Sequence, residues 1–198
     1  MIELLTSKYA FAFLAFAFVL IGYIPYVVST LRGITRPHIL TWSLWGLLNG
    51  IGCAAQLSAG GGLGSVATGG SFAFCVIIAV LAYRQNLVRI TQGDWILFGA
   101  GLLAVPLWFM IESPILAVIW ISIIDFVAFL PTIRKSYHHP VQEKVFAFSV
   151  STLKFIVSLF ALESYSLVTY LYPASLVVTN SSFIAMVLWR RRVLARSQ

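Results

Sequence analysis

Seven long apolar runs, separated by short polar breaks, make up most of this sequence. A bilayer core about 30 Å thick is crossed by about 20 helical residues, and each run approaches or reaches that length. Of the 198 residues, 60% are hydrophobic and only 10% are charged, whereas a soluble domain carries about a quarter charged residues. Long runs with short breaks favour helices over the alternating pattern of a membrane barrel. The predicted spans are residues 9–31, 38–58, 63–83, 95–111, 115–133, 145–162 and 166–189.

The basic residues lie in alternate connections between these runs. A net charge of +7 would suit a nucleic-acid partner, but charges placed between apolar runs orient a membrane protein instead. We predict seven transmembrane helices with the amino terminus outside and the carboxyl terminus inside. We expect a multi-pass protein of the cell inner membrane, with the lipid bilayer as partner and no nucleic acid. The predicted inner segments carry Arg32, Arg36, Arg84, Arg89, Arg134, Lys135, Lys144, Arg190, Arg191, Arg192 and Arg196.

One offset relates the two halves of the chain. A shift of 106 residues without a gap places Pro25 on Pro131 and Arg84 on Arg190. Three spans and one inverting span separate the copies, so both copies would start in the same direction across the membrane. We predict a single membrane domain over residues 1–198, built from two parallel three-helix repeats and an inverting linker helix. The first repeat covers 9–84, the linker 95–111 and the second repeat 115–190.

This pattern resembles the SWEET and PQ-loop superfamily, in which each repeat carries Pro-Gln near the inner end of its first helix. Pro25–Tyr26 and Pro131–Thr132 stand at those places, so the prolines match and the glutamines do not. The resemblance implies a transporter that moves a small polar solute by alternating access between the repeats. A sugar, a nucleoside or a vitamin-like molecule would be such a solute. The resemblance also implies that Pro25 and Pro131 are hinges, because proline inside a helix removes a backbone hydrogen bond. An ordinary packing kink is the alternative.

Four polar residues fall near the middle of their predicted spans. Each lies about ten residues from the inner end of its span, which at about 1.5 Å per residue is near the bilayer midplane. A charged side chain at that depth costs about 2.5–3.5 kcal/mol on insertion scales, so it needs an explanation. The four residues are Asn49, Asp125, Lys154 and Asn180.

These residues are the candidate substrate-binding group. The spans of Asp125 and Lys154 are consecutive, which makes an ion pair between them geometrically reasonable. Such a pair either locks the second repeat together, or it lines a central cavity that binds a polar solute or exchanges a proton. Trp45 shares a helix face with Asn49 and is the predicted aromatic wall of the cavity. By the family resemblance, Asn180 corresponds to a pocket asparagine on the last helix of sugar transporters, although its mate under the same offset is Phe74.

No combination of residues typical of an enzyme or a metal centre stands near the midplane. His138 and His139 are adjacent, so on a helix their side chains would point apart, and we expect them to be solvated. Cys53 and Cys75 lie in apolar spans without metal-ligand spacing. We expect no catalytic activity, no metal and no cofactor. A non-transporting receptor or assembly factor of the same fold is the alternative function, and the sequence leaves open whether the chain forms a homo-oligomer.

Overall fold

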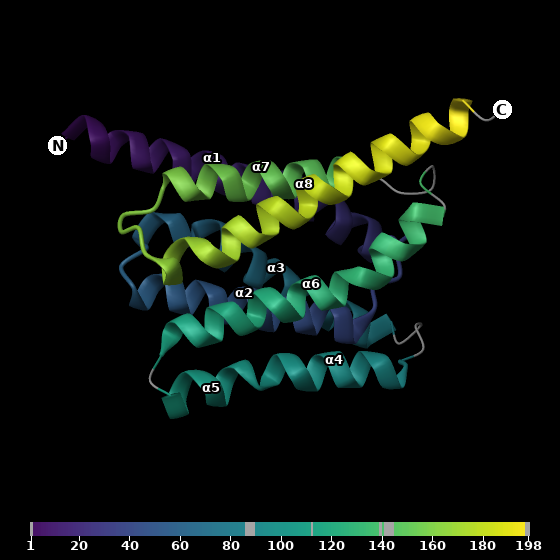
Figure 1. The fold of residues 1–198 in the computed structure, drawn as a ribbon, viewed down its shortest axis with the longest axis horizontal. Coiled ribbons are helices and arrows are strands. Elements are labelled where there is room, and N and C mark those ends of the chain that lie inside the picture. The colour runs from purple at the N-terminus through teal and green to yellow at the C-terminus, as the bar shows by residue number, and fades with distance from the viewer. Residues whose placement is uncertain (1, 86–89, 112, 139, 141–144, 197–198) are drawn as a thin grey trace.

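A computed structural model describes residues 2–85, 90–111, 113–138, 140 and 145–196, which are mainly helical and contain no strand. Consecutive long helices run in opposite directions, and the two termini lie at opposite ends of the longest axis (Figure 1). The elements are α1 (Ile2–Leu31), α2 (Ile39–Ser58), the 3-10 helix η1 (Gly62–Ser65), α3 (Val66–Gln85), α4 (Gln92–Leu102), α5 (Ala104–Ile111), α6 (Pro114–His138), α7 (Val145–Phe160) and α8 (Leu167–Arg196).

Each predicted span is helical, but the predicted linker span is divided in two. Pro106 has no amide hydrogen and cannot bond to the carbonyl of Leu102, so α4 ends at Leu102 and α5 carries the proline in its first turn. At its other end α4 begins with a capping box. The Thr91 hydroxyl accepts from the Asp94 amide, and the Asp94 carboxylate accepts from the Thr91 amide at 2.7 Å.

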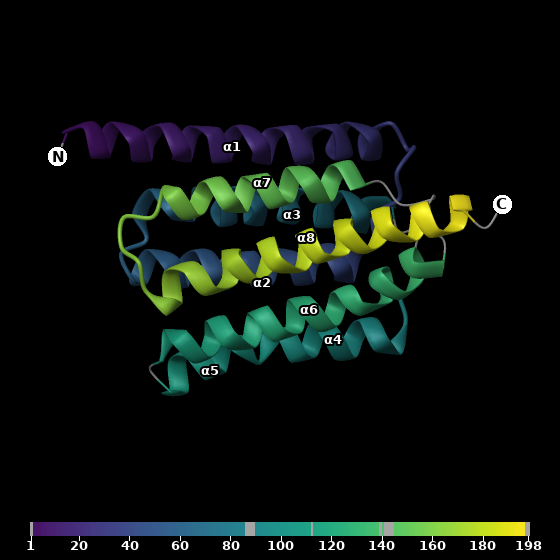
Figure 2. The same cartoon turned by 45° about the horizontal axis from the view of Figure 1, so that its top comes forward.

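Six long helices form a ring. In the first triplet (α1, α2 and α3), α3 packs against both α1 and α2; in the second triplet (α6, α7 and α8), α8 packs against both α6 and α7. The triplets meet where α1 packs against α7 and where α2 packs against α6. Figure 2 shows α8 between α6 and α7. The divided linker lies beside one of these contacts, because α4 packs against both α2 and α6 and α5 packs against α6.

Four helical segments are long and apolar enough to cross a membrane, and they are Thr6–Leu31, Gly62–Gln85, Pro114–His138 and Leu167–Ala195. At most 39% of the most apolar stretch of any of them is buried within the protein, so most of this apolar surface faces outwards. Helices with an apolar exterior suit a lipid environment, since all their backbone hydrogen bonds are internal. The chain is therefore a membrane-associated protein. Helix α2 is not among the four, and it carries the buried polar residues Asn49 and Gln56.

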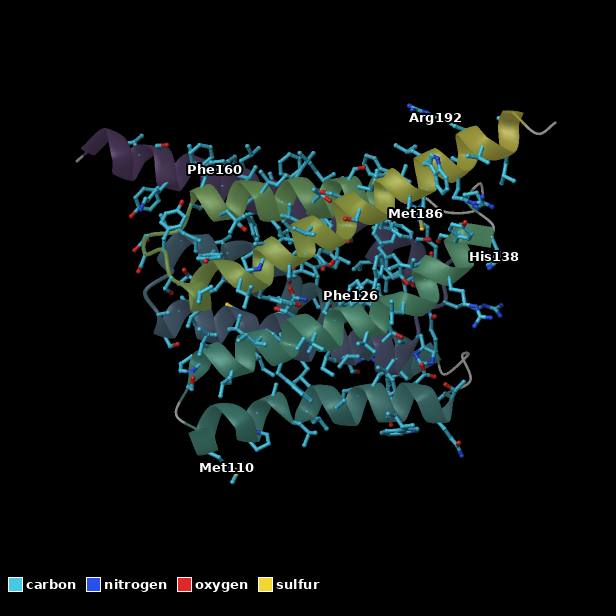
Figure 3. The ribbon with its side chains drawn as sticks, in the orientation of Figure 1. Met110, Phe126, His138, Phe160, Met186 and Arg192 are labelled. Carbon is cyan, nitrogen blue, oxygen red and sulfur yellow. The ribbon has the colours of Figure 1, made fainter. Side chains whose placement is uncertain are left out.

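The two ends of the ring differ in charge. We call one end the basic end, and Figure 3 shows His138 and Arg192 there, with Met110 and Phe160 towards the opposite end. That opposite end, formed by η1 and the connection between α7 and α8, is called the Glu163 end. The described arginines of the basic end are Arg32, Arg36, Arg84, Arg134, Arg190, Arg191 and Arg192.

Hydrogen bonds between the triplets close the Glu163 end. The fully buried Gln56 of α2 donates from Nε2 to the carbonyl of Thr169 in α8 at 2.7 Å, and its Oε1 accepts from the hydroxyl of Thr68 in α3. The Glu163 amide donates to the carbonyl of Gly61 at 3.2 Å. Each of these buried amide and hydroxyl groups has a hydrogen-bond partner. The Glu163 end is therefore held closed by direct hydrogen bonds between the triplets.

Candidate functional site

A cavity of about 560 Å³ lies inside the ring, a volume typical of small-molecule sites, which span roughly 300–1,000 Å³. Helices α1, α2, α6, α7 and α8 contribute to its wall. Its lining reaches Thr35 and the exposed Ala147, and both residues lie beside the basic end. The structure places all five predicted substrate-binding residues around this cavity; their binding of a solute stays a prediction. They are Trp45, Asn49, Asp125, Lys154 and Asn180.

The ammonium group of Lys154 is buried and held by the first triplet. Its side chain is 3% exposed, and Nζ donates a hydrogen bond to the hydroxyl of Ser71 in α3 at 2.7 Å. Nζ also lies 5.0 Å from the ring centroid of Tyr23 in α1 and 4.3 Å from that of Phe155. These aromatic faces stabilise a cation that has left water. Lys154 therefore links α7 to α1 and α3.

The carboxylate of Asp125 faces the cavity from α6 and makes no hydrogen bond or ion pair with any residue that the structure describes. The expected ion pair between Asp125 and Lys154 is wrong, since their charged atoms are more than 4.0 Å apart. The reason lies in the order of helices around the ring. Because α8 packs between α6 and α7, the two consecutive spans are not neighbours in space, and Lys154 turns towards α1 and α3 instead.

Both asparagines are buried, and one of them has an amide oxygen without a hydrogen-bond partner. Asn49 is 7% exposed; its Nδ2 donates to the carbonyl of Trp45 at 2.9 Å, while its Oδ1 has no hydrogen-bond partner. Asn180 is 8% exposed and donates from Nδ2 to the hydroxyl of Ser151 at 3.3 Å. A buried amide oxygen without a partner costs about 1–3 kcal/mol, so the Asn49 oxygen is a place where a bound molecule could restore a hydrogen bond.

Aromatic rings cover the part of the cavity nearest the basic end. Trp42 and Trp45 meet edge to face with ring centroids 5.3 Å apart, and Tyr26 lies 4.7 Å from Trp42. All three side chains line the cavity. Phe74, the offset mate of Asn180, stacks on Tyr23 at 5.3 Å and is not among the lining residues, so no second asparagine lies opposite Asn180 at that position.

The two candidate hinge prolines lie within continuous helices. Pro25 is exposed within α1, which runs on to Leu31. Position 131 lies inside α6, but its side chain is outside the described part of the structure. Their role as hinges stays a prediction.

Sequence reasoning did not include Ser71, Tyr23 or Gln56. Ser71 and Tyr23 surround the Lys154 ammonium group, and Gln56 joins the triplets at the Glu163 end. Gln56 carried a usable signal, because an amide inside an apolar helix is as unusual as Asn49. Ser71 carried none, since small hydroxyl side chains are common in membrane helices, where they often bond to their own backbone.

Nothing in the described part of the chain forms a metal centre, since no group of three or more His, Cys, Asp or Glu residues is close enough to hold an ion. His138 is exposed and its ring contacts Tyr137 at 5.6 Å, whereas His139 lies outside the described residues. The site is thus a cavity that combines opposite charges, amides and aromatic rings. Compared with protein families, curated proteins and solved structures, the chain matches none of them.

Proposed function

We propose that this protein is a seven-helix membrane transporter of the SWEET-like type, which moves a small polar solute by alternating access between two three-helix repeats. One observation carries the proposal: a solute-sized cavity holds Asp125, Lys154 and two asparagines, reaches the basic end and stops short of a closed Glu163 end. A cavity that reaches one end of the protein and is closed at the other is typical of a transporter that is open to one side of the membrane.

The packing of the triplets supports the two proposed repeats. In each triplet the third helix packs between the first and the second. The contacts between triplets are also related, because the first helix of each triplet meets the second helix of the other. A pseudo-twofold axis along the membrane normal produces this pairing, and parallel repeats in transporters have such an axis. The offset of 106 residues relates the same helices in the sequence.

The positive-inside rule assigns the basic end to the inner side of the membrane. In this orientation the cavity is reached from the inside, and the Glu163 end is the outer gate. Transport then requires that the bonds of Gln56 and Glu163 to the other triplet break. A protein of this fold that never opens its Glu163 end would be the non-transporting receptor or assembly factor.

A disulfide across the Glu163 end tests the proposal. A Cβ built on Gly60 lies 3.5 Å from Cβ of Ser164, which matches disulfide geometry of about 3.5–4.5 Å. In a chain with Cys53→Ala and Cys75→Ala, the pair Gly60→Cys and Ser164→Cys would join the loops of the two triplets. Proteoliposomes would be offered radiolabelled sugars, nucleosides, vitamins and amino acids.

We expect uptake of at least one solute, its loss when the disulfide forms and its return with a reductant. Each single cysteine variant is the control, which also measures any strain at Gly60, where φ is +75°. The second measurement is labelling of a cysteine at the cavity residue Thr179 by a membrane-impermeant thiol reagent. No uptake of any solute, with Thr179→Cys labelled from one side only, would favour the non-transporting alternative.

A further inference from the structure

The unpaired groups inside the cavity are of two opposite kinds. Asp125 presents a carboxylate without a protein partner, and Asn49 presents an unpaired Oδ1. Lys154 carries three N–H donors, of which one is used by the Ser71 hydroxyl. The cavity therefore offers hydrogen-bond acceptors from α2 and α6 and a cationic donor from α7.

These two charges are held apart by the protein rather than paired with each other. Their charged atoms are more than 4.0 Å apart, and each is fixed on a different helix of the second triplet. A neutral solute that displaces cavity water would leave both charges less solvated and still unpaired, which is costly. A solute with one charge would pair with one group and would be repelled by the other.

We infer that the cavity takes a zwitterion of the amino-acid type, with its ammonium group on Asp125 and its carboxylate on Lys154. This inference rests on the proposed function and narrows its solute class. The Asn49 oxygen accepts a further ammonium hydrogen. Both charges of the protein and both charges of the solute are then paired, so binding leaves no net charge to carry across the bilayer.

The aromatic wall fits the same solute. Tyr26, Trp42 and Trp45 give the cavity ring faces and edges near the basic end. Such rings contact the hydrocarbon part of an amino acid, and they also attract an ammonium group at their faces. The rings of Tyr23 and Phe155 pack against the ammonium group of Lys154. Lys154 also lines the cavity, so a solute in the cavity approaches its ammonium group from that direction.

The first test uses the wild-type protein in detergent. Thermal stabilisation is measured with the twenty amino acids and glycine betaine, and with glucose, sucrose and uridine as neutral solutes. For the zwitterion that stabilises most, titrations then compare it with the amine that lacks its carboxylate and with the acid that lacks its amine. We expect the zwitterion to bind at least tenfold more tightly than either analogue.

The second test exchanges the charges one at a time. Asp125→Asn should weaken the zwitterion by tenfold or more but strengthen the acid analogue, because the repelling carboxylate is gone. Lys154→Met should weaken the zwitterion similarly and strengthen the amine analogue. Asp94→Asn, which removes a carboxylate that does not line the cavity, is the matched control and should alter the selectivity little. The wild-type comparison decides the matter alone if a variant does not fold.

Two results would overturn the inference. One is a neutral solute that binds wild type and both charge variants equally well, and the other is the absence of a response to every zwitterion. Neither result removes the proposed transport function, because uptake across the Glu163 end is measured separately with the Gly60→Cys/Ser164→Cys disulfide. Loss of the proposed function would show as no uptake of any solute.

Discussion

The Glu163 end and the cavity contain similar polar side chains in opposite states. At the Glu163 end, Gln56 uses both its amide nitrogen and its amide oxygen in hydrogen bonds to other helices. In the cavity, Asn49 lies on the same helix two turns away, and its amide oxygen has no partner. The first arrangement stabilises the fold by itself, whereas the second is complete only when another molecule supplies a partner. Two buried amides on one helix thus differ in role according to the groups that face them.

Substitution of Gln56 should have the largest effect on stability. Gln56→Ala would leave the carbonyl of Thr169 and the hydroxyl of Thr68 without this partner and would open a void in a fully buried site. We expect the free energy of unfolding to fall by about 2–4 kcal/mol. Reversible unfolding in mixed micelles would measure it, with the exposed Gln92→Ala as control. Equal stability of both variants would mean that the Glu163 end is not held closed by this network.

A methyl group at Gly64 should have the next largest effect. A Cβ there would lie 2.8 Å from the Cα of Leu162, so the contact between η1 and the connection from α7 to α8 would have to shift. We expect Gly64→Ala to cost about 1–3 kcal/mol. Gly99→Ala is the matched control, since nothing lies within 4 Å of its Cβ, and that change should be neutral or slightly stabilising. A neutral Gly64→Ala would show that the Glu163 end is loosely packed.

Asp125 should behave in the opposite way from Gln56. Asp125→Asn removes a charge that no described protein group stabilises, so we expect stability without solute to stay the same or to rise by about 1 kcal/mol. Thermal unfolding without and with the best zwitterion separates this gain from the loss of binding. A fall of more than about 1 kcal/mol would make Asp125 a structural residue and would remove the contrast with the Glu163 end.

The contact between Asp94 and His38 should give the smallest effect. Burial raises the pKa of Asp94, but its hydrogen bonds with Thr91 and the charge of His38, 3.3 Å away, outweigh this, so the net pKa lies below its usual value near 3.8. A carboxyl whose folded-state pKa is lowered stabilises the fold above its usual pKa and loses that contribution as the pH falls through the lowered value. Asp94→Asn should therefore cost less than about 1 kcal/mol at pH 6, and the difference from wild type should shrink as the pH falls through the lowered pKa of Asp94. Melting curves across this pH range would test it, and a pH-independent difference would contradict it.

The positions of the helices could be predicted from the sequence because the length of an apolar run directly limits the length of a helix. The break at Leu103 was not foreseen, although Pro106 marks it chemically. Residue counting along each span also predicts a common level for Asp125, Lys154 and the two asparagines, and these four residues line one cavity. Their hydrogen-bond partners could not be predicted, because the level of a residue along its helix does not determine which neighbouring helix its side chain faces.

The order of helices around the ring determines which side chains meet in the cavity. The expectation that consecutive spans are neighbours in space gives the wrong ion pair of Lys154 with Asp125. The interposed α8 and the contact of α7 with α1 send Lys154 to Ser71 instead. Such an order depends on contacts between residues far apart in the chain, and neither hydropathy nor charge in the sequence records it.

The divided linker has a mechanical consequence. Helix α4 bridges α2 and α6 on one side of the ring, and α5 continues along α6. Helix α4 therefore holds this contact between the triplets together. The contact between α1 and α7 is bridged by a shorter element, the four-residue helix η1 at the Glu163 end. In the proposed alternating access, the triplets would therefore pivot at the contact between α2 and α6 and separate at the contact between α1 and α7. Lys154 of α7 contacts Ser71 in α3 and Tyr23 in α1. These contacts would have to break before α7 could separate from the first triplet.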